Sequence, residues 1–180
     1  MKIFLLTLSL LGVVYSASFD YKHKPSWDKA YRLDLDSLYA ISQNLIKNDE
    51  VFKSIKHLND IISNTNDNNL KLNCYYDLAQ IYLSRSNDYN KSISYFNLIL
   101  NHKSNFASNK NSKLKKHDDL NEKSLFMIGY IYHNHTGNLS LAKKFYEKFL
   151  DYHPNSDLIS SVQYEIDVIN SMINEYENKK

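Results

Sequence analysis

Two stretches of this 180-residue chain match each other when one is shifted by fifty positions along the other. Residues 78–82 (LAQIY) align with residues 128–132 (IGYIY), and the similarity continues from residues 92–100 to residues 142–150. In both copies apolar residues recur every three or four positions, which is the spacing of an amphipathic helix. A repeat of helix pairs is typical of arrays in which each unit covers the apolar flank of the next. We therefore predict an all-α fold that presents surfaces to other proteins.

Glycine and proline are scarce, with three and two residues in the whole chain. A sheet protein needs many tight turns, and those turns depend on glycine, proline or Asn-Gly pairs. The composition therefore favours long helices joined by turns rich in Asn, Asp and Ser. Cys74 is the single cysteine, so no internal disulfide can form, and its place among apolar helical residues predicts a buried thiol.

The first eighteen residues have the parts of a secretory signal peptide. Lys2 precedes an apolar run from Ile3 to Val14, and small residues follow it, with cleavage possible after Ser16 or Ser18. The run is shorter than the roughly 20 residues of a membrane-spanning helix. We expect residues 1–18 to be removed on export, residues 19–33 to form an N-terminal extension, and residues 34–180 to form the helical domain. The expected location is the periplasm, if the source is bacterial, or the outside of the cell.

Periodicity predicts seven helical segments, which are centred on residues 37–45, 51–62, 72–82, 92–100, 120–132, 141–150 and 158–172. Between residues 103 and 119 the chain is polar, basic and aperiodic, so we predict a long exposed insertion there. Pro154 ends the sixth segment because its ring cannot continue a helix.

The spacing of small and aromatic residues resembles the tetratricopeptide repeat, in which two antiparallel helices form a unit of about 34 residues. Gly129 and Ala142 stand at the small positions of one copy, Tyr132 and Tyr146 at its aromatic positions, and Pro154 at its end. Phe149 stands where the family usually has alanine. Ala79, Tyr82, Ser92, Phe96 and Ile99 follow the same order in the second copy, whereas the earliest pair fits only by Ser54, Leu58 and Ile61.

This resemblance implies a right-handed superhelical array of about three antiparallel helix pairs with a C-terminal capping helix. The polar residues Glu165, Asp167, Asn170 and Glu177 are expected on the outer side of that last helix. A related helix pair, the Sel-one-like repeat, is a second possibility because residues 133–138 are similar to its glycine-containing turn. Both repeats have the same architecture, so the predicted fold class is the same.

In such arrays ligands usually lie along a concave side lined by the first helix of each pair. The resemblance therefore implies a binding site for a peptide or protein partner whose residues are Asn73, Tyr76, Gln80, Lys123, Phe126, Tyr130, His133 and Asn134. The aromatic members would anchor apolar side chains, and Lys123 and Asn134 would hold a peptide backbone or carboxylate.

No motif in the sequence points to catalysis, to a cofactor or to a metal. His133 and His135 lie two positions apart, so they do not share a helix face, and no cysteine or carboxylate stands at ligand spacing beside them. Without Lys2, 21 basic side chains face 20 acidic ones, and this balance gives no electrostatic footprint for nucleic acid. We expect a non-enzymatic scaffold of the cell envelope. The alternative is a structural subunit that docks through residues 19–21 and Trp27, next to the apolar flank of its first pair.

Overall fold

The computed structural model of this protein describes residues 34–102 and 112–179, with side chains throughout these ranges except at residues 112–118. The predicted signal peptide and N-terminal extension lie outside the described residues. Within these ranges the chain forms helices and no strands. The helices are α2 (Leu35–Lys47), α3 (Val51–Asn64), α4 (Asn68–Ser84), α5 (Tyr89–Leu100), α6 (Ser112–Asn134), α7 (Leu139–Tyr152) and α8 (Ile159–Asn178).

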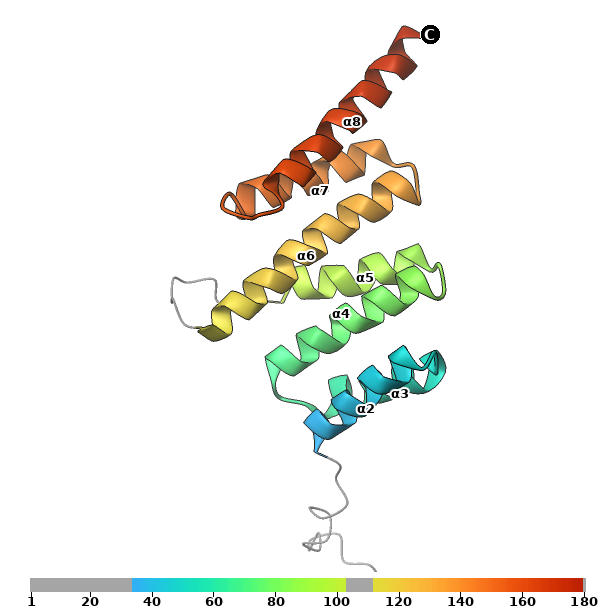
Figure 1. Cartoon of the computed structure of the whole chain (residues 1–180), viewed down its shortest axis with the longest axis vertical. Helices are drawn as coiled ribbons and strands as arrows, with labels where there is room; N and C mark the ends of the chain where they lie inside the picture. Colours follow the sequence, from blue (N-terminus) through green and yellow to red (C-terminus); the bar gives the residue numbers. More distant parts are fainter. Residues whose placement is uncertain (1–33, 103–111, 180) are drawn as a thin grey trace, which may run out of the picture. The chain divides into compact units, whose positions relative to one another are not determined.

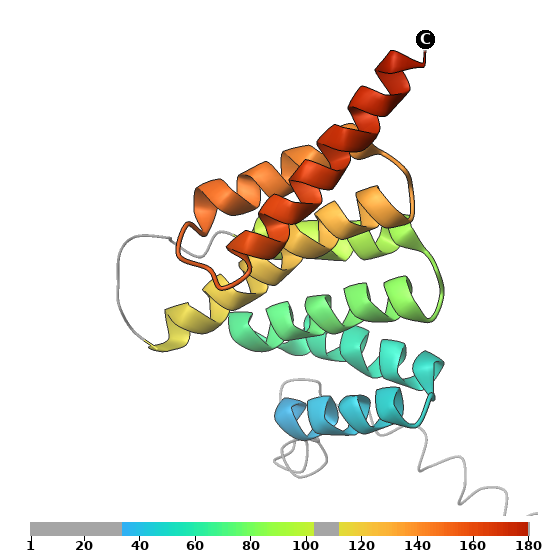
Figure 2. The same ribbon diagram turned by 45° about the horizontal axis from the view of Figure 1, so that its top comes forward.

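Three antiparallel pairs, α2–α3, α4–α5 and α6–α7, follow one another along the chain, and α8 packs on α7 (Figure 1). Each pair touches the next through its neighbouring helices, because α3 contacts α4 and α5 contacts α6. The first helices α4 and α6 are also in contact (Figure 2). The predicted all-α array of three helix pairs followed by a last helix is therefore confirmed.

The two helices of each pair meet at small residues. In the first pair the Ser54 hydroxyl donates to the Ser42 carbonyl at 3.1 Å, and in the second the Ser92 hydroxyl donates to the Ala79 carbonyl at 2.8 Å. All four residues are fully buried. Two helices can approach to about 8–10 Å only where the side chains between them are small. Ser42 is thus the small residue of the first pair, and the sequence analysis missed it.

Gly129 is the small residue of the third pair. A Cβ atom on Gly129 would lie 2.7 Å from Cε1 of Tyr146, so the tyrosine ring occupies the space that a side chain would need. Tyr146, Phe96 and Leu58 follow the small residue of their second helix at the same spacing, and all three are fully buried. The side chains between the helices therefore grow from leucine to phenylalanine to tyrosine along the chain.

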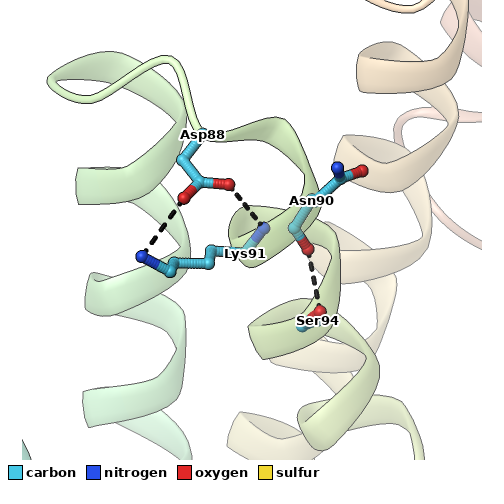
Figure 3. A network of polar contacts seen from close by, with 4 residues as sticks. All are labelled: Asp88, Asn90, Lys91 and Ser94. Carbon is cyan, nitrogen blue, oxygen red and sulfur yellow. Dashed lines mark hydrogen bonds and ion pairs between the residues drawn. The ribbon is translucent and has the colours of Figure 1, made fainter.

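The turn inside each pair has one residue in the left-handed conformation, immediately before the N-cap of the second helix. These residues are Asp49 (φ 62°), Asn87 (φ 50°) and Gly137 (φ 66°). Asparagine, aspartate and glycine tolerate this conformation best. The Asp88 carboxylate then accepts a hydrogen bond from the Lys91 backbone at 3.1 Å and forms an ion pair with its side chain at 3.3 Å, while the Ser94 hydroxyl donates to the Asn90 carbonyl at 2.8 Å (Figure 3). The Asn-rich turns of the sequence thus end in N-caps that start the following helix.

Two expectations from the sequence are wrong in part. Helix α6 begins at Ser112, so residues 112–119 of the predicted aperiodic insertion are helical; residues 103–111 lie outside the described residues. The segment contains three lysines and one leucine, residue types that favour helix even where apolar periodicity is absent. On α8, Glu165 and Asn170 do not face outward, because they bind His133 of α6 and Lys143 of α7 at 2.8 Å each. Asp167 and Glu177 are exposed as expected, and Tyr164 and Met172 are exposed beside them.

Cys74 lies in the core, as predicted. Its side chain is fully buried against Leu58, Ile61, Leu78 and other residues of the first two pairs. Burial raises the pKa of the Cys74 thiol to about 12, and the nearby Asp77 carboxylate adds to this effect. The thiol is therefore protonated at neutral pH and acts as a small apolar residue.

Candidate binding face on the first helices

The eight residues that were predicted to bind a partner lie on two helices that touch each other. Asn73, Tyr76 and Gln80 are on α4, and Lys123, Phe126, Tyr130, His133 and Asn134 are on α6. Tyr76 lies three residues before the small residue Ala79 of α4, and Gln80 follows it directly. Tyr39 and Gln43 have the same positions relative to Ser42 of α2. We refer to these residues of α2, α4 and α6 as the binding face. Tyr39 and Gln43 were missed because Ser42, from which they are counted, was not recognised.

The predicted aromatic anchors are half-buried and pack within their own pairs. Tyr76 meets Phe96 edge-on, with ring centroids 5.7 Å apart, and Phe126 lies 5.8 Å from Tyr146 and 6.5 Å from Phe149. Tyr130 meets the His135 ring at 5.5 Å. These rings therefore contribute to the cohesion of each pair, and only their outer edges are open to a ligand.

A polar network connects the binding face of the first pair to that of the second. The Asp77 carboxylate of α4 accepts hydrogen bonds from the Tyr39 hydroxyl at 2.7 Å and from the Gln43 amide at 2.6 Å, both on the same oxygen. Burial raises the pKa of Asp77, and the two hydrogen bonds lower it by less. Burial and the neighbouring carboxylate likewise raise the pKa of Tyr39. Asp77 was not among the predicted residues, because only a tertiary contact between α2 and α4 gives it this role.

The Asp77→Asn variant is expected to be more stable than the wild type at neutral pH. The pKa of Asp77 in the folded state lies above its ordinary value of 3.8, so the folded chain binds the proton more tightly than the unfolded chain. The wild type therefore loses stability as the pH rises from 3.8 through the raised pKa, and the variant does not. Asparagine keeps an oxygen that can accept from Tyr39 or Gln43.

Urea unfolding at about pH 3 and about pH 7 measures this difference, which should be small at the lower pH and larger at the higher. Asp60→Asn on α3 is the matched control, because Asp60 is exposed. If the difference in free energy of unfolding between variant and wild type were equal at both pH values, or larger at the lower one, it would contradict the expected role of Asp77.

The far end of the binding face is tied to α8. Nδ1 of His133 lies 2.8 Å from Oε2 of Glu165, and the Asn134 amide donates to the Tyr130 carbonyl at 3.2 Å, one turn back in the same helix. Lys123 and Asn134 are exposed, and Asn73 and Gln80 are half-buried. The groups that remain accessible on the face are thus mainly side-chain amides and one ammonium group.

The described residues offer no arrangement of three or more His, Cys, Asp or Glu side chains that could hold a metal ion. His135 instead stacks on Tyr89, with ring centroids 4.5 Å apart. Of the helices that the structure describes, none combines the length and the apolar character that crossing a membrane requires. The chemistry that the binding face can perform is hydrogen bonding and apolar contact.

Two parts of the chain match known protein families. Residues 72–103 and residues 123–156 each match a model of the tetratricopeptide repeat, and these ranges cover most of α4–α5 and of α6–α7. No curated protein matches the chain. Tetratricopeptide repeats are in general interaction modules without catalytic activity. The second and third helix pairs of this chain therefore match the tetratricopeptide repeat, and the described residues form an all-helical, TPR-like solenoid.

Proposed function

We propose that this protein is an exported, non-catalytic scaffold that binds a peptide segment or a partner protein on its binding face. The observation that carries the proposal is the repetition of the face. Tyr39, Tyr76 and Phe126 occupy one row on the three first helices, and Gln43, Gln80 and Tyr130 occupy the next. A repeated row of rings and amides on contacting helices suits an extended chain, whose own groups repeat at regular intervals.

The polar groups of the face favour a peptide with an acidic group. Side-chain amides donate and accept, so Asn73, Gln80 and Asn134 match the N–H and C=O groups of a peptide backbone. Lys123 of α6 adds an exposed positive charge to the face. One oxygen of the half-buried Asp77 already accepts from Tyr39 and Gln43 at 2.7 and 2.6 Å, so Asp77 offers a basic ligand less than a free carboxylate would.

Photo-crosslinking in cells tests this proposal. A photoreactive amino acid at Lys123 should give discrete adducts with a partner, because Lys123 is exposed on the binding face. The same amino acid at Lys144, which is exposed on the second helix α7, is the matched control and should not give these adducts. Identical adducts at both positions, or none at Lys123, would count against the binding face.

The proposed location rests on the sequence of residues 1–18. Cell fractionation should find the protein outside the cytoplasm, and N-terminal sequencing of the recovered protein should begin at Ala17 or Phe19. Replacing Leu5 and Leu6 with arginine breaks the apolar run and is expected to keep the full-length chain in the cytoplasm. A chain that retains Met1 in the exported fraction would contradict a cleaved signal peptide.

A second candidate function is that of a structural subunit which docks through its first helix pair. Phe52 on α3 favours this candidate, because its side chain is 90% exposed, an unusual position for a phenylalanine. Light scattering of the purified chain over a range of concentrations distinguishes the two functions. The scaffold should be monomeric, whereas a subunit with an uncovered apolar flank should self-associate and lose this behaviour in the Phe52→Ser variant.

A further inference from the structure

A cavity lies between the two tetratricopeptide repeats, away from the binding face. Its volume is about 550 Å³, and its lining comes from α5, α6 and α7, near the C-terminal ends of α5 and α7. The three helices follow one another in the array (Figures 1 and 2). This volume is within the range of small-molecule and peptide side-chain sites. None of the residues that were predicted to bind a partner lines it.

The side-chain amide of a largely buried residue lines this cavity. Asn121 of α6 is 8% exposed and lines the cavity, and its side chain forms no hydrogen bond with any residue in the described part of the chain. Asn97 on α5 and Asn101 at the C-cap of α5 supply two more amides from a second wall. Each amide can donate and accept, which is the pattern that a peptide group needs.

The rest of the lining defines what lies beside these amides. Leu100, Leu125 and Phe145 give the cavity an apolar part. Lys148 is the lining residue with a permanent charge, and its Nζ lies 5.3 Å from the centroid of the Phe145 ring. No ion pair among the described residues includes Lys148. The ammonium group at the edge of the apolar part therefore has capacity for an anion.

We propose that this cavity is a second binding site, and that it takes a short extended segment of a partner protein in which one bulky apolar side chain is followed by a carboxylate. The apolar side chain lies against Leu100, Leu125 and Phe145. The backbone next to it pairs with the amides of Asn97 and Asn121, and the carboxylate pairs with Lys148. The carboxylate comes either from an acidic side chain or from the C-terminus of the segment, since the chemistry of the two is the same.

Fluorescence anisotropy of labelled peptides with the full chain tests this site. Each peptide has one phenylalanine in a glycine–serine background. The first peptide has a glutamate after the phenylalanine and an amidated end, the second has a free C-terminal carboxylate instead, and the third has glutamine and an amidated end. The first or the second should bind about tenfold more tightly than the third, which identifies the source of the carboxylate.

Two variants and one control locate the bound peptide. Asn121→Leu keeps the side-chain size while it removes the amide, and should weaken binding about tenfold. Lys148→Gln is an exposed change that should reduce the affinity of the carboxylate peptide to that of the neutral one. Lys144→Gln makes the same chemical change at an exposed position of α7 outside both sites and should leave the affinity unaltered.

The proposal is overturned if no carboxylate peptide binds at up to about 1 mM, or if binding is unaffected by both Asn121→Leu and Lys148→Gln. Binding that only Lys123→Gln, a variant of the binding face, weakens would place the peptide on that face. That outcome would support the proposed function while it rejects the second site, so the two failures can be told apart.

Discussion

Replacing Gly129 with leucine is expected to lower the free energy of unfolding by about 3 kcal/mol, the upper part of the usual range for overpacking. Even the first atom of such a side chain would lie 2.7 Å from the ring of Tyr146. That ring is fully buried within the third pair, so it cannot move aside without opening the contact between α6 and α7. Urea unfolding followed by circular dichroism measures the loss.

Gly137 provides the matched control. Nothing lies within 4 Å of a Cβ atom at this position, but its φ of +66° is unfavourable for other residues. Gly137→Ala should therefore cost only about 1–2 kcal/mol. Replacing Tyr146 with leucine in the Gly129→Leu background should recover part of the loss, because the blocking ring is gone. A Gly129→Leu variant as stable as Gly137→Ala would show that α6 and α7 do not meet closely.

Replacing Phe149 with alanine is expected to cost about 3–5 kcal/mol. The side chain is fully buried and packs with Val162, Ile166 and Ile169 of α8 as well as with Phe126 of α6. Alanine is usual at this position in the tetratricopeptide repeat, so resemblance alone would predict a mild effect. Here α8 packs against the larger ring of Phe149. Removal of this ring leaves a cavity that the surrounding helices can fill only in part.

Phe52→Ala tests whether burial is the cause. Phe52 is 90% exposed, so the same chemical change should alter the free energy of unfolding by less than about 0.5 kcal/mol. Comparison of the two variants in urea separates loss of packing from any general effect of removing a phenylalanine. If Phe149→Ala were as mild as Phe52→Ala, α8 would have to be able to move inward and close the cavity.

The second and third helix pairs could be predicted because the local sequence of each contains the spacing of small and aromatic residues that is typical of the repeat. Ala79, Ser92, Phe96 and their counterparts Gly129, Ala142 and Tyr146 recur at a constant spacing. Both helices of the first pair were predicted, but the repeat pattern was matched only in the second of them, and the small residue Ser42 of the first was missed. The start of α6 was missed because residues 112–119 are helical without an apolar stripe.

The candidate site was predictable as a row of positions but not as a set of contacts. The rings of Tyr76 and Phe126 stand at positions that the repeat assigns to the ligand, yet each also packs on a ring of the second helix, Phe96 or Tyr146. A rotation of a few degrees about the helix axis decides how much of such a ring stays open. Helical spacing assigns a residue to a face, and the crossing of two helices decides its exposure.

The sequence by itself determined that the chain forms paired helices, which helices come first, and where the small residues of the second and third pairs lie. These properties depend on spacings of three or four residues, which a single helix already contains. The tertiary structure alone decided that Asp77 binds Tyr39 and Gln43, 38 and 34 positions away, that His133 meets Glu165, and that Asn121 faces a cavity between two repeats. Such contacts join residues far apart in the chain, so they exist only once the packed pairs bring their helices together.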